Sequence, residues 1–394
     1  MRVYASFDPF PAPKGAATHI TAFVGTLARE YGAFDLLTVT PSEDTRASPP
    51  ALPSCVRHRP LPVPGRTLID RVMSFREGMR RWWRGRRAEL VHVRSIFEGY
   101  PLARGKGRLC ERFVYEVNSF PSIELKYHYP DVADDRELMA KLEAQEQLCL
   151  EAADLVLTPS AVTGELIRAR GVDAARLRVI PNGVDPRLFG YQSPRARGEG
   201  PLRLLYSGTL SAWQGIDVAI EALALLRRDH EAELTIVGPG RKRQRRRIAE
   251  RAASLGVADH VTRLPGCSQL ELCAHHHAAD AVLAPLLAND RNLVQGCSPL
   301  KVIEAMATGT PVVASDLPVV RELATNGVDA LLVRPGSAKA VKDGLLRLVE
   351  SPRLATDLSV AARARVESGL SWSLAGQRLI AAYEEVLGGL SMSP

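Results

Sequence analysis

The stretch GCSPLKVIEAMATGTPVVAS (residues 296–315) contains the pattern of a helix followed by a buried strand. Ser298 is a residue type that caps helices, and Pro299 suits a first helical position, so we expect a helix over 299–308. TPVVAS (310–315) is typical of a strand. The first turn of such a helix presents free N–H groups and the positive end of the helix dipole, and both favour a phosphate group.

Lys301 and Glu304 are three residues apart in this helix and therefore share one of its faces. A cation beside a phosphate, with a carboxylate near enough to accept hydrogen bonds from ribose hydroxyls, suits a nucleoside diphosphate sugar. The alternative is a surface helix with an ordinary intrahelical ion pair, and the two residues taken alone favour that alternative.

Strands and helices alternate on both sides of this stretch, which predicts an α/β fold with two doubly wound parallel sheets. In the second half we expect strands at 201–208, 233–238, 260–264, 281–285, 310–315 and 330–333, and helices at 214–229, 243–255, 268–278, 299–308 and 338–350. In the first half we expect strands at 2–7, 33–40, 90–94, 112–117 and 153–160, helices at 14–32 and 134–152, and a Pro-rich loop at 41–66.

The segment VIPNGVDPRLFGYQSPRARGEG (179–200) interrupts this alternation, since Asn182-Gly183 is typical of a turn and Pro, Gly and Arg accumulate after it. We therefore place a domain boundary here. The expected domains are an N-terminal domain at 1–185, a linker at 186–200 and a C-terminal domain at 201–370, followed by a last helix at 371–394. Ligands of open α/β sheets bind beyond the carboxyl ends of the strands, so we expect functional residues in the loops that follow strands.

The length of 394 residues also favours two domains. No apolar run approaches the ~20 residues of a membrane-spanning helix, and the start MRVYASFDPF has no secretory pattern, so we expect a cytoplasmic protein. The six cysteines have no CxxC spacing, which favours free thiols over a zinc site. The net charge of +7 suits an anionic ligand, an anionic membrane surface or nucleic acid, and does not choose among them.

The sequence EAMATGTPVVAS that starts at Glu304 resembles the donor-site signature of the retaining glycosyltransferase family 4, which has the GT-B fold. Further segments resemble successive elements of that family: VIPNGVDPRLF (179–189) its interdomain linker, and YSGTLSAWQGIDVAIEAL (206–223), LTIVGPG (234–240) and HHAADAVLAPL (276–286) its donor domain. Together these matches cover most of 153–330. The resemblance implies two Rossmann-like domains that face each other across a cleft, with the last helix packed back on the first domain.

The resemblance further implies a hexosyltransferase-like enzyme that moves a sugar from a nucleoside diphosphate, UDP or GDP, to an acceptor with retention of configuration. The acceptor would be a glycan, a lipid-linked saccharide or a small molecule, as in polysaccharide biosynthesis. No Asp-x-Asp motif follows a strand, so we expect neither a metal nor another cofactor. Two alternatives stay open: a catalytically silent GT-B scaffold, and another GT-B enzyme such as a sugar-nucleotide epimerase.

Three family positions differ in this chain. Gly296 stands where the family usually has a carboxylate that contacts the donor sugar, and Thr209 and Gln214 stand where it usually has a diphosphate-binding Arg and Lys. Phosphate binding would then depend on the helix N-terminus, on Lys301 and on backbone N–H groups after the strand that ends near Gly208.

The resemblance therefore assigns the site residues as follows. The residues implied in catalysis are Lys301, Glu304 and Asn118, the last standing where many members have a sugar-contacting His. The residues implied in donor binding are Gly15, Ala16, Gly208, Thr209, Gln214, Gly238, Leu264, Gly296, Ser298, Pro299 and Leu300. On the acceptor side we expect His19, Arg94, at the end of a predicted strand, and Glu124.

Three other segments suggest different chemistry. The run His275–His277 near Cys273 could bind a metal, but consecutive His side chains point in different directions on a helix. The run RKRQRRR (241–247) could bind nucleic acid, yet a solvated basic face explains it better, and we expect no nucleic-acid partner. The basic segment 71–87 could lie on the inner face of the cell membrane as a peripheral contact, although a helix packed on its own sheet is favoured.

Overall fold

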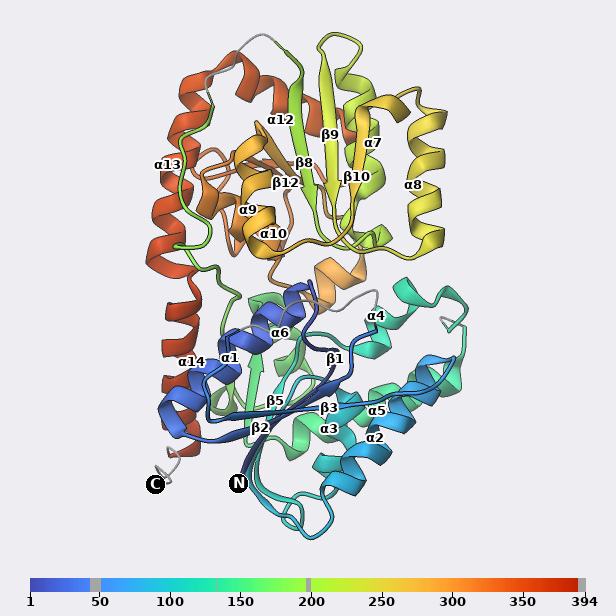
Figure 1. Ribbon diagram of the computed structural model, residues 1–394, viewed down its shortest axis with the longest axis vertical. Coiled ribbons are helices and arrows are strands. Elements are labelled where there is room, and N and C mark those ends of the chain that lie inside the picture. Colours follow the sequence, from blue (N-terminus) through green and yellow to red (C-terminus); the bar gives the residue numbers. More distant parts are fainter. Residues whose placement is uncertain (43–50, 133, 196–199, 389–394) are drawn as a thin grey trace. The chain divides into compact units, whose positions relative to one another are not determined.

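The parallel sheet of the first half has seven strands in the order β3-β2-β1-β4-β5-β6-β7 (Figure 1). The computed structural model describes residues 1–42, 51–132, 134–195 and 200–388. It divides into two compact units, one of Met1–Pro181 with Ala375–Pro394, and one of Asn182–Leu374. The described part of the expected linker, residues 186–195 and 200, belongs to the second unit in this division.

In the first unit the strand order reverses direction beside β1, as it does in doubly wound sheets. Its strands are β1 (Arg2–Pro9), β2 (Phe34–Val39), β3 (Val56–Leu61), β4 (Ala88–Val93), β5 (Cys110–Glu116), β6 (Leu155–Thr158) and β7 (Leu177–Val179). Its helices are α1 (Gly15–Tyr31), α2 (Leu68–Trp82), α3 (Ile96–Arg104), α4 (Pro121–His128), α5 (Arg136–Ala152), α6 (Ala161–Ala169) and most of α14 (Trp372–Leu387).

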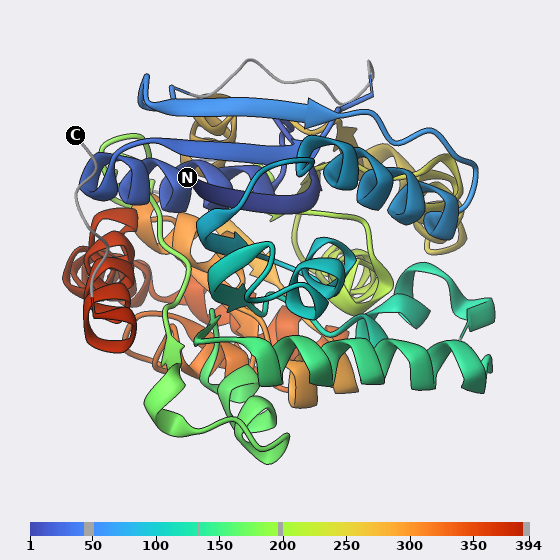
Figure 2. The same ribbon diagram turned by 90° about the horizontal axis from the view of Figure 1, so that it is seen from below.

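The last helix, α14, lies beside α1 on one face of this sheet, as both ribbon views show (Figures 1 and 2). Tyr383 stacks on Tyr31 of α1 at 5.9 Å between ring centres, and its hydroxyl is 2.7 Å from Nδ1 of His92 in β4. Gly376 lies so close to Thr26 that an added Cβ would come within 2.9 Å of the threonine hydroxyl. These contacts bury the apolar stripe of the helix, including Leu379 and Tyr383.

The second unit contains a six-stranded parallel sheet in the order β10-β9-β8-β11-β12-β13. Its strands are β8 (Leu202–Ser207), β9 (Ala232–Val237), β10 (Val261–Leu264), β11 (Ala281–Ala284), β12 (Val312–Ser315) and β13 (Leu331–Val333). Its helices are α7 (Ile216–Leu226), α8 (Lys242–Ser254), α9 (Gln269–Ala278), α10 (Leu300–Thr308), α11 (Pro318–Arg321), α12 (Ala338–Glu350) and α13 (Pro352–Gly369). The predicted α/β architecture of two doubly wound parallel sheets is therefore confirmed.

Several elements differ from the sequence-based expectation. The loop predicted at 41–66 contains β3, whose Pro60 is tolerated because β3 is the edge strand of its sheet; residues 43–50 lie outside the described residues. Helix α13 and the short strand β7 were not predicted. Both have weak patterns: β7 spans three residues, and α13 has a long polar face with only scattered buried positions.

Candidate functional site

Helix α10 of the second unit carries the two residues that the sequence placed at the centre of a nucleotide site. Lys301 and Glu304 are both buried, at 6% and 8% exposure. The Lys301 ammonium lies over the ring of Tyr206, 3.9 Å from its centre, and makes no hydrogen bond to any described residue. It forms no ion pair with Glu304 either, so the alternative of an ordinary intrahelical pair is not realised among the described residues.

Burial changes the acid–base behaviour of both groups. It lowers the pKa of Lys301 to about 7, and it raises the pKa of Glu304 to about 7. A buried ammonium without a hydrogen-bonded counter-ion is costly to a protein and is found where a ligand supplies the missing charge. Lys301 is therefore a candidate anion-binding residue.

The loop after β8 lies directly against Lys301. Gly208 has φ 133°, and a Cβ there would come within 3.1 Å of Lys301 Nζ. Gly238, after β9, has φ 154°, and a Cβ there would lie 1.9 Å from the carbonyl oxygen of Gly208. Both positions need glycine, because the two strand ends are packed backbone against backbone and the chain must pass close to the ammonium.

Thr209 and Gln214 complete this loop and bond to each other, with Gln214 Nε2 donating to Thr209 Oγ1 at 3.2 Å. The Tyr206 hydroxyl donates to the Thr209 carbonyl at 2.9 Å, which fixes the ring that covers Lys301. Leu264, the last residue of β10, accepts a hydrogen bond from the N–H of Gly238. The structure thus brings together five of the residues expected to bind a donor, namely Gly208, Thr209, Gln214, Gly238 and Leu264.

The segment before α10 differs from the expectation in one respect. Ser298 does not cap the helix: α10 begins at Leu300, Pro299 holds the cap position, and no side chain caps it. The Ser298 hydroxyl instead accepts the backbone N–H of Asn182 at 3.1 Å, which removes it from the helix end. Gly296 has φ 83° and its carbonyl accepts a hydrogen bond from Arg291.

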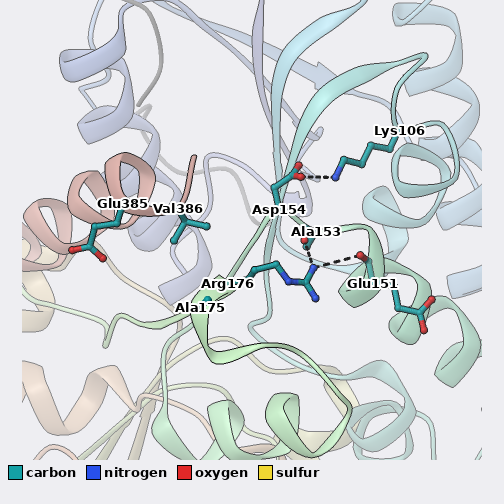
Figure 3. Close-up of a pocket in the computed structure, with 8 residues that line it drawn as sticks. All are labelled: Lys106, Glu151, Ala153, Asp154, Ala175, Arg176, Glu385 and Val386. Atoms are coloured by element: carbon teal, nitrogen blue, oxygen red, sulfur yellow. Dashed lines mark hydrogen bonds and ion pairs between the residues drawn. The ribbon is translucent and has the colours of Figure 1, made fainter. Parts of the chain in front are cut away.

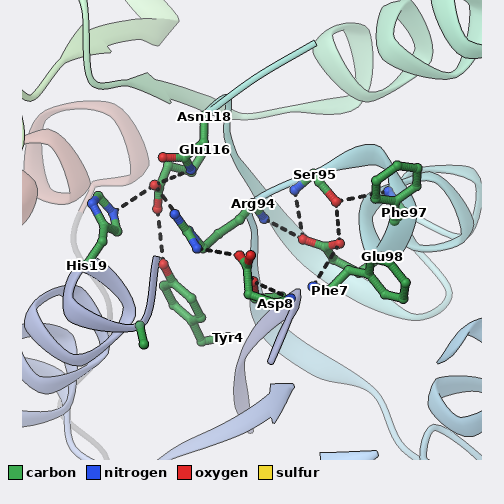
Figure 4. A network of polar contacts seen from close by, with 12 residues as sticks. Tyr4, Phe7, Asp8, His19, Arg94, Ser95, Phe97, Glu98, Glu116 and Asn118 are labelled. Carbon is green, nitrogen blue, oxygen red and sulfur yellow. Dashed lines mark hydrogen bonds and ion pairs between the residues drawn. The ribbon is translucent and has the colours of Figure 1, made fainter. Parts of the chain in front are cut away.

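The first unit holds a second cluster of polar groups, centred on Glu116 at the carboxyl end of β5 (Figure 4). This side chain is buried, and donors from four elements surround it. The Oε1 atom of Glu116 lies 2.7 Å from His19 Nε2, 2.6 Å from Asn118 Nδ2 and 3.4 Å from Arg94 Nε. The Oε2 atom lies 2.9 Å from His92 Nε2 and 3.1 Å from the Tyr4 hydroxyl.

The cluster therefore joins three residues that the sequence assigned to this unit: His19, Arg94 and Asn118. They meet because β1, β4 and β5 are neighbours, so their carboxyl ends share one edge of the sheet. Gly15 and Ala16 form the first turn of α1, the helix that supplies His19. Glu124 is not among the residues of Figure 4; it lies in α4 and forms an ion pair with His128 at 3.4 Å.

The electrostatics of the cluster favour an ionised Glu116. Burial alone would raise the pKa of Glu116, but His19 and Arg94 hold it well below the usual range. Burial would lower the pKa of Arg94, and Glu116 and Asp8 raise it instead. His92 is fully buried, and burial lowers its pKa, so it acts as a neutral structural partner of Glu116.

Glu98 fixes the backbone around Arg94. Its carboxylate accepts the N–H groups of Arg94 at 2.9 Å and Ser95 at 2.7 Å, and Ser95 starts α3 with a capping box. Burial raises the pKa of Glu98 to about 7. The turn after β4 is thereby held in one conformation, with the Arg94 side chain directed at Glu116 and Asp8 (Figure 4).

Sequence reasoning missed Glu116 and Asp8 as site residues. The signal was a carboxylate at the end of an otherwise apolar strand, RFVYEV for Glu116 and RVYASFDP for Asp8. From the sequence, Glu116 lies inside the strand expected at 112–117 and Asp8 directly follows the strand expected at 2–7. Neither stood out, because the neighbours that make them important come from other parts of the chain.

A pocket of about 430 Å³ lies at the opposite, amino end of the same sheet (Figure 3). It is lined by Lys106, Glu151, Ala153, Asp154, Ala175, Arg176, Glu385 and Val386. Its charged groups have partners within the protein: Lys106 Nζ is 2.6 Å from Asp154, Arg176 donates to the Ala153 carbonyl at 2.6 Å, and Glu385 pairs with Arg178. The pocket contains none of the expected site residues.

The other suggestive segments have structural roles. His276 is fully buried and burial lowers its pKa to about 3, while His277 bonds to the Gly190 carbonyl at 2.7 Å. Within the described ranges no group of three His, Cys, Asp or Glu residues is arranged to hold a metal. Helix α8 pairs Arg246, Arg247 and Arg251 with acidic residues.

Helix α2 buries Val72, Phe75 and Met79 against its own sheet, which confirms the favoured interpretation of that basic segment. It leaves Ile69 and Met73 exposed. Among the helices that the structure describes, none has the length and apolar character required to cross a membrane.

Comparison with known proteins gives one matching family model in each half of the chain. Residues 13–188 match the model of Glycosyltransferase Family 4, and residues 192–365 match that of Glycosyl transferases group 1. The MMP alpha-(1->4)-mannosyltransferase of Mycolicibacterium hassiacum is 31% identical over 256 residues, or 62% of this chain and 57% of that protein. The D-inositol 3-phosphate glycosyltransferase of Frankia alni is 30% identical over 271 residues, or 65% and 64%. The matches thus span less than two thirds of these relatives.

Solved structures share the fold over nearly the whole chain. Sucrose-phosphate synthase from Thermosynechococcus elongatus superimposes with a TM-score of 0.79 at 21% identity, covering 98% of this chain and all of that one. HepE of Anabaena in complex with UDP-glucose gives a TM-score of 0.74 at 16% identity, covering 98% and 99%. At these identities the likeness establishes the fold alone.

Proposed function

Since this chain belongs to the group 1 and family 4 glycosyltransferases, we propose that it transfers a sugar from a nucleoside diphosphate sugar to a hydroxyl group of an acceptor. The observation that carries the proposal is Lys301, a buried ammonium without a hydrogen-bond partner, directed at the glycine loop after β8. A diphosphate is the anion that suits this position, because Glu304, one turn along the same helix, can accept hydrogen bonds from ribose hydroxyls.

In this proposal the chain acts by placing charge rather than by an acid–base pair of carboxylates. The ammonium of Lys301 and the first turn of α10 stabilise the negative charge that grows on the departing diphosphate. The acceptor side is the Glu116 cluster, where Asn118 and His19 can bond to sugar hydroxyls. The configuration of the sugar would be retained, with the leaving diphosphate helping to deprotonate the acceptor on the same face, as the family resemblance implies.

The donor base is proposed to be uracil or guanine. HepE of Anabaena was solved with UDP-glucose, and its similarity in fold supports the UDP member of this pair. The acceptor is proposed to be a saccharide, free or lipid-linked. A lipid-linked acceptor would require the protein to work at the cytoplasmic face of a membrane, where the exposed Ile69 and Met73 of α2 could make peripheral contact.

Two specific observations keep a silent scaffold as a second candidate. Thr209 and Gln214 carry no charge, and Gly296 has no side chain, so three groups that usually contact the donor are missing. A scaffold would bind a nucleotide sugar and return it unchanged, whereas an epimerase would change the sugar without an acceptor. Both differ from a transferase in what happens to a labelled donor.

The Glu304→Gln variant tests the nucleotide site. The donor is whichever of UDP-glucose and GDP-mannose the wild type binds. We expect the dissociation constant of the variant for this donor to rise about tenfold or more, because an amide accepts hydrogen bonds from two ribose hydroxyls less well than a carboxylate does. Isothermal titration of both variants measures this change. Glu350→Gln, an exposed carboxylate at the end of α12, is the matched control and should bind as the wild type does. Equal affinity in Glu304→Gln and wild type would remove Glu304 from the nucleotide site.

Donor affinity should also depend on pH with a maximum near pH 7. The diphosphate prefers protonated Lys301, whose pKa is lowered to about 7 by burial, so affinity should fall as this proton is lost on the alkaline side. The ribose prefers ionised Glu304, whose pKa is raised to about 7 by burial, so affinity should fall as this group gains a proton on the acid side. An intact nucleotide sugar is the right probe, since its diphosphate does not itself titrate near neutrality.

Titrations between about pH 5 and 9 measure this profile. The Lys301→Met variant should lose the alkaline limb, and Glu304→Gln should lose the acid limb. A profile that keeps both limbs in both variants would show that other groups govern donor binding.

A further inference from the structure

Asp8, the penultimate residue of β1, is the exposed member of the buried cluster around Glu116 (Figure 4). Its side chain is 40% exposed, whereas those of its partner Arg94 and of Glu116 are 6% and 2% exposed. It ends the first strand at the edge of the sheet where ligands of such folds bind. The Asp8 side chain is therefore accessible to an acceptor that reaches this cluster.

The carboxylate of Asp8 is held in one orientation by its Oδ2 atom. Oδ2 accepts a hydrogen bond from Arg94 Nη1 at 2.7 Å and one from the Ser6 hydroxyl at 2.8 Å. The Ser6 hydroxyl also accepts the backbone N–H of Asp8 at 3.3 Å, which closes a small ring at the strand end. The other oxygen, Oδ1, accepts no hydrogen bond from a described residue, so it is the atom left for a ligand.

Arg94 is not available to an anionic acceptor in this arrangement. Its guanidinium already faces two carboxylates, Glu116 through Nε at 3.4 Å and Asp8 through Nη1 at 2.7 Å. Glu98, which accepts the backbone N–H of Arg94, adds a third carboxyl group nearby. A phosphate brought to this edge would approach the Asp8 carboxylate, while Arg94 already faces Asp8 and Glu116.

We propose that Asp8 binds a hydroxyl group of a neutral, polyhydroxylated acceptor and selects against acceptors that carry a phosphate at that position. The inference rests on the proposed function. It adds that the acceptor group bound near the end of β1 is a neutral hydroxyl group. Arg94, which the sequence placed on the acceptor side, acts in this proposal by orienting Asp8. A carboxylate oxygen of fixed direction is a strong acceptor for a sugar hydroxyl, and its charge repels a phosphate.

The test compares transfer to neutral and phosphorylated partners. The protein is incubated with the nucleotide sugar that it hydrolyses and with a mixture of myo-inositol and D-inositol 3-phosphate, which compete as acceptors. A parallel reaction contains a mixture of methyl α-mannoside and mannose 6-phosphate instead. Products are measured by mass spectrometry, and hydrolysis of the donor without acceptor is measured alongside. For the acceptor pair that gives a product, we expect the wild type to form at least about tenfold more product from the neutral acceptor than from the phosphorylated one.

In Asp8→Asn, transfer to the neutral acceptor should fall about tenfold, chiefly through a higher KM, and the preference for the neutral member should fall about tenfold as well. Donor hydrolysis should stay within about twofold of wild type, because the donor residues lie on α10 and the β8 loop. A variant that was merely less well folded would lose hydrolysis and transfer together and would keep its preference. Glu111→Gln, which removes an exposed, arginine-paired carboxylate from β5, is the matched control and should change nothing.

Several results would overturn the inference. They are a wild-type preference for the phosphorylated member, an unchanged preference in Asp8→Asn, or no transfer to any neutral acceptor while the donor is still hydrolysed. Absence of both donor hydrolysis and transfer would contradict the proposed function itself and, with it, this inference. The two failures are thus told apart by the hydrolysis measurement.

Discussion

The Lys301→Met variant is expected to be more stable than the wild type and to bind a nucleoside diphosphate sugar at least about tenfold more weakly. The two effects have one cause, a buried ammonium that no described residue bonds to. Its contact with the Tyr206 ring offsets only part of the cost of burial, since the pKa of Lys301 still falls to about 7. Methionine fills a similar volume without a charge, so we expect a gain of about 1–3 kcal/mol in the free energy of unfolding.

The sign of the pH dependence can be stated in advance. The pKa of Lys301 is lower in the folded chain than the value of roughly 10.4 expected in the unfolded chain. Between these two values the unfolded chain binds more protons, so the wild type gains stability as pH rises from about 7 toward 10. The advantage of Lys301→Met should therefore be larger at pH 7 than at pH 10.

Chemical denaturation at both pH values and isothermal titration with the nucleotide sugar measure the two effects. Lys339→Met, which removes an exposed lysine paired with Asp343, is the control and should change neither stability nor affinity appreciably. If Lys301→Met were destabilised and bound the donor normally, Lys301 would be a structural residue and the nucleotide site would lie elsewhere.

The Glu116→Gln variant is expected to lose about 3–5 kcal/mol of stability, the typical result of removing one partner from a buried charged network. The amide would present an N–H group to donors from His92 and Tyr4 and would leave Arg94 with Asp8 as its remaining ion pair. Glu111→Gln changes the same residue type on the same strand at an exposed position, so it should stay within about 0.5 kcal/mol of the wild type.

Lowering the pH should reduce the difference in the free energy of unfolding between Glu116→Gln and the wild type. The pKa of Glu116 is held well below its unfolded value, so its contribution is present above roughly pH 4 and is lost as pH falls through the folded pKa. Denaturant unfolding at pH 7 and at the lowest pH where the wild type stays folded measures this trend. A difference of less than about 1 kcal/mol at pH 7 would mean that Glu116 is not the centre of the network.

Local patterns were enough to predict the alternation of strands and helices, because each element carries its own periodicity. They were also enough to bring Lys301 and Glu304 into one site, since these residues are neighbours on one helix. Ser298 was wrongly assigned as a helix cap because its actual partner, Asn182, is far away in the sequence. Short or polar elements such as β7 and α13 lack the apolar repeat that makes an element recognisable.

The Glu116 cluster could be predicted only in part. Arg94 was expected because it follows a predicted strand, and Asn118 and His19 were assigned from the family resemblance. Glu116 and Asp8 were not, because their importance depends on the order in which β1, β4 and β5 pair, which brings residues about 100 positions apart into contact. A sheet order of this kind is set by packing of the whole unit and is not visible in any short stretch of sequence.

The fate of a labelled donor distinguishes a glycosyltransferase from a silent scaffold and from an epimerase. Isotopically labelled UDP-glucose and GDP-mannose are incubated with the protein, with and without neutral saccharide acceptors, and followed by mass spectrometry and by NMR of the anomeric proton. We expect the labelled sugar to move to an acceptor, with one nucleoside diphosphate released per sugar transferred. We also expect the new glycosidic bond to have the anomeric configuration of the donor. Recovery of a bound but unchanged donor, or of an epimerised sugar without transfer, would contradict the proposed function.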